Sequence, residues 1–264
     1  MEGERHSKRG AGMRKRVEGR IAGSILLVIV AVLAAGTYGR NSLWKSEIGF
    51  WEDCVRKAPG KERVHHNLGF AYYEEARWED ARREFQTALD LNPRYALSIY
   101  NLGLVFYQEG MMDQAIGCYQ RALALDDSKP DTYFNLGLAY YQKGCYPEAV
   151  DSFGALLRIK PGYENAHYRL GLAYQRLRKW DRAIESYREE MRENPEDPRP
   201  YVHLGDLYLE RKDYPRALVH FKRALACPDL SDADRVIKII SSIEGNRKDD
   251  ARRTDEKRKE SAEG

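Results

Sequence analysis

Apolar and polar positions follow a pattern that repeats every 34 residues along most of the chain. Each copy has a Leu-Gly pair, an aromatic residue three positions after the glycine, an alanine nine positions later, and a second aromatic four beyond that. The Leu-Gly pairs are Leu68-Gly69, Leu102-Gly103, Leu136-Gly137, Leu170-Gly171 and Leu204-Gly205. The second aromatics are Phe85, Tyr119, Phe153, Tyr187 and Phe221. These spacings predict two amphipathic helices in each copy.

Two helices of this kind cannot bury their own apolar faces, so copies are expected to stack side by side. The glycine has no side chain, so a partner helix is expected to approach it closely at the alanine position, as Gly137 and Ala149 would. Pro93, Pro161 and Pro195 end three of the second helices.

This pattern resembles the tetratricopeptide repeat at its signature positions. The resemblance implies an all-α, right-handed solenoid of five helix-turn-helix repeats with a capping helix, preceded here by one transmembrane helix. The five repeats are residues 62–95, 96–129, 130–163, 164–197 and 198–231. Two departures stand where a small residue follows the second aromatic: Leu156 in the third repeat and Glu190 in the fourth.

Both ends of the array are also patterned. Residues 39–61 read as a juxtamembrane half-repeat, whose helix carries Trp44, Ile48, Trp51, Cys54 and Val55 ahead of Pro59. Residues 232–245 read as a capping helix with Val236, Ile237, Ile240 and Ile243 on one face. Residues 246–264 hold charges of both signs and no aromatic residue, which predicts a disordered tail.

Residues 21–38 form an uncharged apolar run that is long enough to span a bilayer. Seven Lys or Arg lie in the basic tail 1–20, whereas Arg40, Lys45, Arg56 and Lys57 follow the run. The positive-inside rule therefore predicts a single-pass protein with a cytoplasmic N-terminus and periplasmic or otherwise extracytoplasmic repeats. A cleaved signal peptide ending near Val32-Leu33-Ala34 is the alternative, and it exports the same repeats.

Charge and cysteine spacing exclude several classes. The formal net charge is +3 and concentrates in the basic tail, so the repeats lack the basic stripe of a nucleic-acid binder. The four cysteines, Cys54, Cys118, Cys145 and Cys227, form no C-x-x-C pair, which argues against a zinc ribbon or a redox site.

No catalytic, cofactor-binding or metal-binding motif is found, so an enzyme is not expected. Asp232-Ala233-Asp234 resembles a D-x-D metal motif, but acidic residues also suit the first turn of a helix. His65 and His66 are adjacent on a predicted helix and cannot share a metal. His65 and His167 stand where the repeat usually has tryptophan, which favours packing.

The predicted binding surface is the face of the first helices that is turned away from the second helices. The position before each leucine is Asn67, Asn101, Asn135, Arg169 and His203. Three asparagines in register resemble the ladder in the repeats of O-linked N-acetylglucosamine transferase, which implies a grip on the backbone of an extended peptide. The aromatics beside them are Phe70, Tyr73, Tyr100, Tyr107, Phe134, Tyr141 and Tyr168. The alternative is that asparagine is simply tolerated at an exposed helical site.

The junction around Arg40-Asn41, Trp44-Lys45, Trp51, Val55 and Pro59 is similar to the entry into the C-terminal repeats of multi-pass, mannosyltransferase-type membrane proteins. The multi-pass part that holds the catalytic acids of that family has no counterpart in these residues. The favoured function is a membrane-anchored scaffold that binds a protein or peptide partner. The alternatives are an accessory module of a membrane protein-glycosylation system, and self-assembly through repeat stacking.

Overall fold

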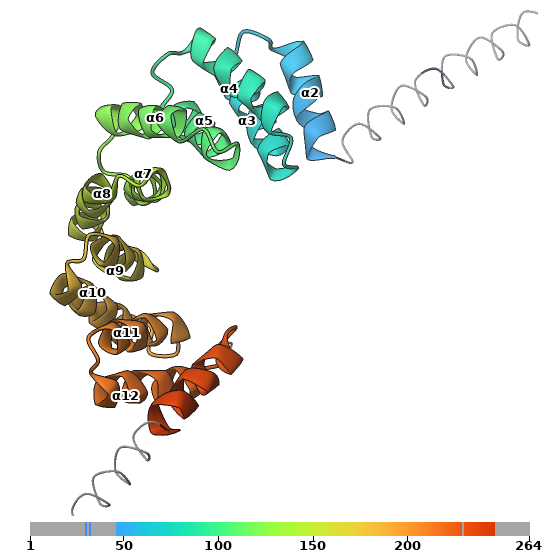
Figure 1. The fold of residues 1–264 in the computed structure, drawn as a ribbon. Coiled ribbons are helices and arrows are strands. Elements are labelled where there is room, and N and C mark those ends of the chain that lie inside the picture. Colours follow the sequence, from blue (N-terminus) through green and yellow to red (C-terminus); the bar gives the residue numbers. More distant parts are fainter. Residues whose placement is uncertain (1–29, 31, 33–45, 229, 246–264) are drawn as a thin grey trace, which may run out of the picture. The chain divides into compact units, whose positions relative to one another are not determined.

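The computed structural model describes residues 30, 32, 46–228 and 230–245, which form helices and the turns between them (Figure 1). No strand occurs among these residues, so the all-α class is confirmed for them. The chain divides into two compact units at Ser98 and Ile99, within helix α5 (Ala96–Gln108).

Unit 1 contains α2 (Glu47–Lys57), α3 (Glu62–Glu74) and α4 (Trp78–Leu91), and α3 packs against both of the others. The Ser46 hydroxyl accepts a hydrogen bond from the Gly49 N–H at 3.0 Å and so begins α2. The helix expected to start at residue 43 is therefore described only from Glu47, because residues 43–45 lie outside the described part.

After the rest of α5, unit 2 is a series of neighbouring helices (Figure 1). They are α6 (Met112–Leu125), α7 (Pro130–Lys143), α8 (Tyr146–Ile159), α9 (Ala166–Arg176), α10 (Trp180–Glu193), α11 (Pro198–Glu210) and α12 (Tyr214–Leu225). From α6 onward each helix packs against the next one in the chain, which is the expected stacking of pairs.

The turn inside each pair has the same backbone form throughout. In every repeat the turn between the two helices has one residue with a positive φ: Ala76, Gly110, Gly144, Arg178 and Lys212. These positions are 34 residues apart. The N–H of the residue after each one donates a hydrogen bond to a carbonyl oxygen of the first helix, as the Asp213 N–H does to the Tyr208 oxygen at 2.8 Å. Only two of the five are glycine, so three repeats hold a side chain in the left-handed region.

The core corrects one expectation about the Leu-Gly glycines. A Cβ built on Gly137 would stand 2.6 Å from the Phe153 ring, and the other four glycines face the second aromatic of their own repeat in the same way. The glycine is thus covered by the aromatic ring and not by Ala149, because the ring reaches back one turn along the second helix. All five of these aromatic side chains are fully buried.

The fourth repeat begins later than its 34-residue window. Asn165 has a φ of 61° and makes no side-chain cap, so α9 starts at Ala166. The Glu190 carboxylate caps it instead, since its Oε2 accepts a hydrogen bond from the Tyr168 N–H at 2.9 Å while Oε1 accepts one from Asn194 at 2.7 Å. The departure from a small residue at Glu190 therefore has a structural role.

Residues 233–245 form the expected final helix, with Val236, Ile240 and Ile243 buried against the last repeat. Ile237 is 48% exposed, which corrects its assignment to that face. A residue one position after Val236 points about 100° away from it around the helix.

The apolar run 21–38 lies outside the described residues except for Val30 and Val32. Among the residues that are described, no helix is both long and apolar enough to cross a membrane. The basic tail 1–20 and the charged tail 246–264 also lie outside them.

Candidate functional site

The predicted binding residues lie on the first helix of each repeat, in unit 1 and in unit 2. In unit 1, Asn67 is half-buried and Phe70 is 41% exposed, and the Phe70 ring stacks near that of Tyr73 with centroids 6.4 Å apart. In unit 2, the side chains of Tyr107, Phe134 and Tyr141 are half-buried. These residues keep part of their surface available to another molecule.

The position before each leucine is less open than the sequence suggests. Asn101 is only 7% exposed, and Asn135 donates a hydrogen bond from Nδ2 to the Tyr100 hydroxyl at 2.8 Å. The carboxamide of Asn135 is therefore already engaged with the preceding repeat. A guest peptide would compete with Tyr100 for it.

A similar contact, with histidine in place of asparagine, occurs two repeats further along the chain. The Tyr168 hydroxyl lies 3.1 Å from His203 Nε2, and the His203 ring stacks on Tyr187 with centroids 5.5 Å apart. Burial lowers the pKa of His203, so the ring is neutral near pH 7. Tyr168 is itself 8% exposed, so these two predicted contact residues serve mainly to pack one repeat on the next.

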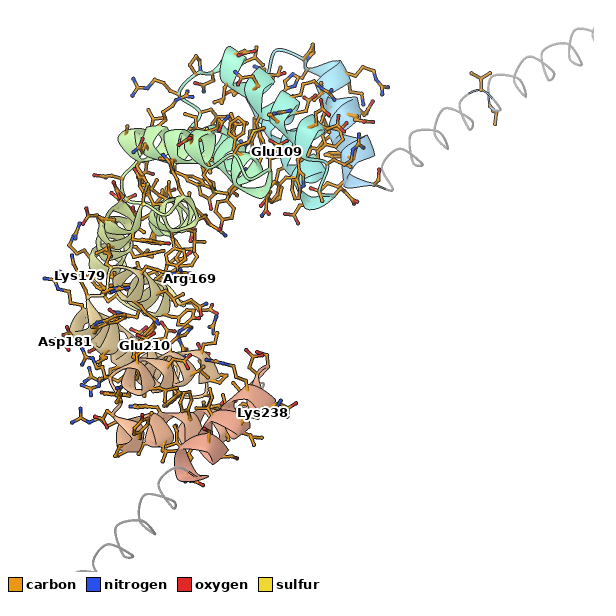
Figure 2. The ribbon with its side chains drawn as sticks, in the orientation of Figure 1. Glu109, Arg169, Lys179, Asp181, Glu210 and Lys238 are labelled. Atoms are coloured by element: carbon orange, nitrogen blue, oxygen red, sulfur yellow. The ribbon has the colours of Figure 1, made fainter. Side chains whose placement is uncertain are left out.

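Arg169 breaks this series. The preceding repeat has Phe134 where Tyr100 and Tyr168 carry their hydroxyl, so it offers no hydrogen bond to Arg169. The Nε of Arg169 is buried and has no hydrogen-bond partner in the described part of the chain. Figure 2 shows Arg169 on the side of unit 2 opposite to Lys179 and Asp181. A buried donor without a partner is uncommon in folded proteins and calls for an explanation.

Arg176 belongs to the same surface, although the sequence analysis missed it. It follows Arg169 by seven residues, which is two turns of α9 and therefore the same face. Its Nε donates a hydrogen bond to the Tyr141 hydroxyl at 3.1 Å. A hollow of about 310 Å³ next to it is lined by Tyr141, Leu172, Arg176, Trp180, His203 and Glu210. In the sequence, the seven-residue spacing of Arg169 and Arg176 is the signal that would have placed both arginines on this face.

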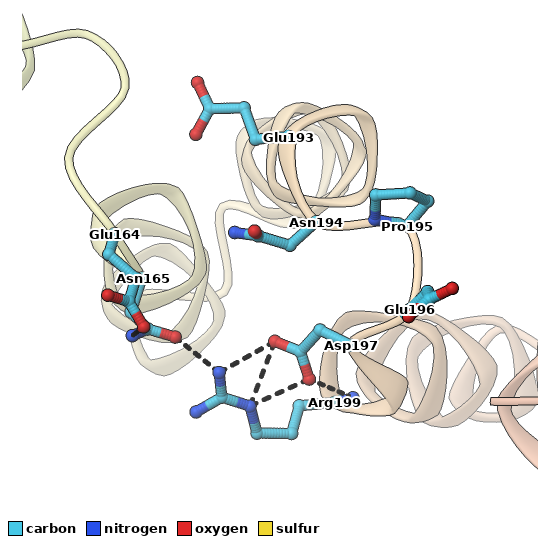
Figure 3. A pocket seen from close by; sticks show the side chains of 8 residues that line it. All are labelled: Glu164, Asn165, Glu193, Asn194, Pro195, Glu196, Asp197 and Arg199. Carbon is cyan, nitrogen blue, oxygen red and sulfur yellow. Dashed lines mark hydrogen bonds and ion pairs between the residues drawn. The ribbon is translucent and has the colours of Figure 1, made fainter. Parts of the chain in front are cut away.

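A second hollow, of about 420 Å³, lies where α9 begins beside the loop between α10 and α11 (Figure 3). Glu164, Glu193, Glu196 and Asp197 give it an acidic lining. Arg199 enters it and binds both Asp197, at 2.8 Å, and Asn165 of the preceding repeat. Hydrogen bonds to Asp197 raise the pKa of the Arg199 guanidinium. The bond from Arg199 to Asn165 joins the fifth repeat to the fourth.

The histidines that the sequence singled out take part in packing. His65 is 7% exposed, and its ring nitrogens lie 2.8 Å from Glu84 Oε2 and 2.9 Å from the Pro59 carbonyl oxygen. His167 lies 3.8 Å from Glu193. No group of three metal-binding side chains occurs within residues 46–228 and 230–245.

Sequence profiles of known families match most of the repeat region. A profile described as TPR repeat matches residues 69–110, 105–144 and 137–177, and one described as tetratricopeptide repeat matches residues 168–232. Among curated proteins, a protein O-mannosyl-transferase of Caenorhabditis elegans is 26% identical over 69 residues. That match spans 26% of this chain and 10% of the relative's length.

The chain is also similar in fold to solved structures, three of which are those of MamA, YrrB and PilF. The crystal structure of MamA has a TM-score of 0.59 at 25% identity and covers 60% of this chain and 93% of its own. YrrB, described as a TPR protein with an unusual peptide-binding site, has a TM-score of 0.63 at 17% identity, with coverages of 71% and 97%. PilF of Pseudomonas aeruginosa has a TM-score of 0.57 at 22% identity, with coverages of 69% and 88%.

Proposed function

Because the chain belongs to the tetratricopeptide repeat family, we propose that it is a scaffold protein that binds an extended segment of a partner protein. The contact surface is the exposed face of the first helices, on α9 and its neighbours in unit 2. The peptide-binding site named for YrrB supports a role of this kind. A scaffold that binds and releases a partner without chemistry agrees with the lack of a catalytic motif in the sequence.

The observation that carries the proposal is the state of Arg169. Its buried Nε has no hydrogen-bond partner among the described residues, while the equivalent Asn135 and His203 are engaged by tyrosines. An arginine presents five N–H donors in a fixed plane, which suits the carbonyl and carboxylate oxygens of a peptide. Tyr141 and Leu172 line the hollow beside Arg176, two turns along α9 from Arg169, and supply apolar surface for the side chains of the guest.

The test uses a partner that is captured by crosslinking on the intact protein and identified by mass spectrometry. Arg169→Gln removes the charge and keeps a hydrogen-bonding group, whereas Lys179→Gln makes the same change on the opposite side of unit 2 (Figure 2). A hydrogen bond to a charged group is worth about 1.5–3 kcal/mol, which corresponds to roughly a tenfold to hundredfold weaker Kd. Calorimetry should show this loss for Arg169→Gln alone. Equal Kd values for the two variants would contradict the proposed site.

The scaffold is proposed to be membrane-anchored by residues 21–38, with the repeats outside the cytoplasm. The uncharged run and the seven basic residues before it support this orientation. A reporter that is active only in an oxidising compartment should be active when fused at Gly264. Activity of a cytoplasmic reporter at the same place would reverse the orientation.

A role in membrane protein glycosylation is the second candidate. It is favoured by the similarity to a protein O-mannosyl-transferase, although this chain spans only 10% of that relative's length. The chain would then position an acceptor polypeptide for a separate membrane enzyme. Comparing the envelope glycoproteins of cells with and without the chain by mass spectrometry tests this, and an unchanged profile would exclude it.

A further inference from the structure

Helix α2 lies one 34-residue period before α4 in the sequence, in the position of a repeat's second helix, and it packs against α3. Counting back 34 residues from Ala81 and Phe85 gives Glu47 and Trp51. Ala81 and Phe85 have 0% exposure because α3 covers them. Glu47 is exposed and Trp51 is half-buried, and the Trp51 indole N–H donates to Glu47 Oε1 at 3.4 Å.

The exposed Glu47 decides what kind of surface can lie against this side of α2. A first helix packed here, from this chain or from a second copy, would place the carboxylate where five repeats have a fully buried alanine. Burying a carboxylate without a cationic partner costs several kcal/mol, as an order of magnitude. The neighbour must therefore accept an apolar ring and leave a charge in contact with water.

The membrane–water interface meets both requirements. Tryptophan is enriched there because its ring is apolar and its N–H remains hydrated. The apolar run ends at Tyr38, and eight residues separate it from Glu47. Eight residues span at most about 29 Å when fully extended, so α2 lies close to the bilayer if residues 21–38 cross it.

The contact is expected to depend on the ring and not on charge. The two cations of α2, Arg56 and Lys57, both pair with Asp53, and Glu47 and Glu52 add two more carboxylates, so the helix has no net positive charge with which to attract lipid headgroups. Ion pairs weaken in salt, whereas burial of an aromatic ring does not. Binding of α2 to lipid should therefore survive high ionic strength.

We propose that α2 lies along the surface of the bilayer, with the Trp51 side toward the lipid and Glu47 in the hydrated headgroup layer. The proposal rests on the proposed anchor at residues 21–38. It also makes the proposed scaffold function more specific. The first repeats would lie next to the membrane, so a partner would have to approach them from the aqueous side.

The experiment reconstitutes the full chain in phosphatidylcholine vesicles, with and without brominated acyl chains that quench tryptophan fluorescence. One variant keeps only Trp51 by replacing Trp44, Trp78 and Trp180 with Phe. The matched control keeps only Trp78, which is also half-buried and lies on α4 beside Tyr73. Circular dichroism confirms that both variants keep the helical content of the wild type.

Loss of most of the Trp51 emission in brominated vesicles, with little loss for Trp78 and no effect of high salt, is the expected result. If the chain floats with the vesicles and Trp51 is quenched no more than Trp78, the position of α2 is wrong and the anchor stands. If the chain does not float with the vesicles, the anchor itself fails, and the position of α2 fails with it.

Discussion

The Glu190 carboxylate lies 2.9 Å from the backbone nitrogen of Tyr168, at the first turn of α9, and is itself fully buried. It occupies the place of the small residue that follows the second aromatic in most repeats. A carboxylate at the N-terminus of a helix is stabilised by the helix dipole and by the free N–H groups there. The fourth repeat thus takes its cap from the second helix of its own pair.

Replacing Glu190 should separate its hydrogen bonds from its charge. Glu190→Ala leaves the Tyr168 N–H and the Asn194 amide without their acceptor, which is expected to cost about 1–3 kcal/mol of unfolding free energy. Glu190→Gln keeps an acceptor and should lose less than about 1 kcal/mol. Urea unfolding measures both. A Glu190→Ala variant as stable as the wild type would show that the buried charge costs as much as its bonds contribute.

The close approach of Gly137 to Phe153 predicts that even one methyl group is too large there. Gly137→Ala places a Cβ 2.6 Å from the ring and should destabilise the chain by about 1–3 kcal/mol through overpacking. Gly117→Ala is the matched control, because it lies inside α6 with nothing within 4 Å of the new Cβ. That variant should gain about 0.5–1 kcal/mol from better helix propensity. Melting temperatures that move in the same direction would contradict the packing described.

The bond between Asn135 and Tyr100 predicts that Asn135 contributes to stability as well as to any binding. Asn135→Ala and Tyr100→Phe should each cost about 0.5–1.5 kcal/mol, and the double variant should cost little more than either one. Thermal unfolding of the four proteins measures the coupling. Additive losses would show that the two side chains act independently in solution.

A pH dependence follows from His66, which is buried in unit 1 with Nδ1 3.0 Å from the Ser98 hydroxyl. Burial, and secondarily the nearby Arg63 charge, lower its pKa to about 4. Because the folded pKa lies below the unfolded value of about 6.5, the unfolded chain binds the extra proton first. Stability should therefore fall as pH drops from about 6.5 to about 4, by about 2–3 kcal/mol if only this group titrates.

The measurement is urea unfolding between pH 4 and pH 7.5, compared with that of His66→Gln. Glutamine keeps a hydrogen bond to Ser98 and does not titrate, so its profile should be flatter over the same range. Parallel profiles would assign the acid sensitivity to other groups.

The features of the fold that depend on the repeat period and on residue size could be predicted from the sequence. The pairs of helices and the burial of Phe85 and its equivalents follow from the 34-residue pattern, and the final helix follows from the apolar face of residues 232–245. It did not show that the aromatic ring, and not Ala149, covers Gly137, because the reach of a side chain along a helix is a matter of rotamer.

The candidate site was harder to predict for a related reason. Asn101, Asn135 and His203 occupy equivalent positions, but their availability depends on which aromatic the preceding repeat supplies. A hydroxyl that is present on Tyr100 and absent on Phe134 changes the state of a residue 35 positions later. Residue types at one position of a repeat do not reveal such contacts between repeats.

The exchange of tyrosine for phenylalanine at Phe134 also has a mechanical consequence. With the proposed anchor at residues 21–38 and the proposed partner at Arg169, the repeats between these two points would carry tension in series. The Tyr100–Asn135 and Tyr168–His203 bonds join two pairs of neighbouring repeats in unit 2, whereas the third and fourth repeats, which carry Phe134 and Arg169, are joined instead by the bond from Arg176 to the Tyr141 hydroxyl. A guest bound at Arg169 would add contacts at this same junction, so the partner would reinforce the tether at the place where it binds.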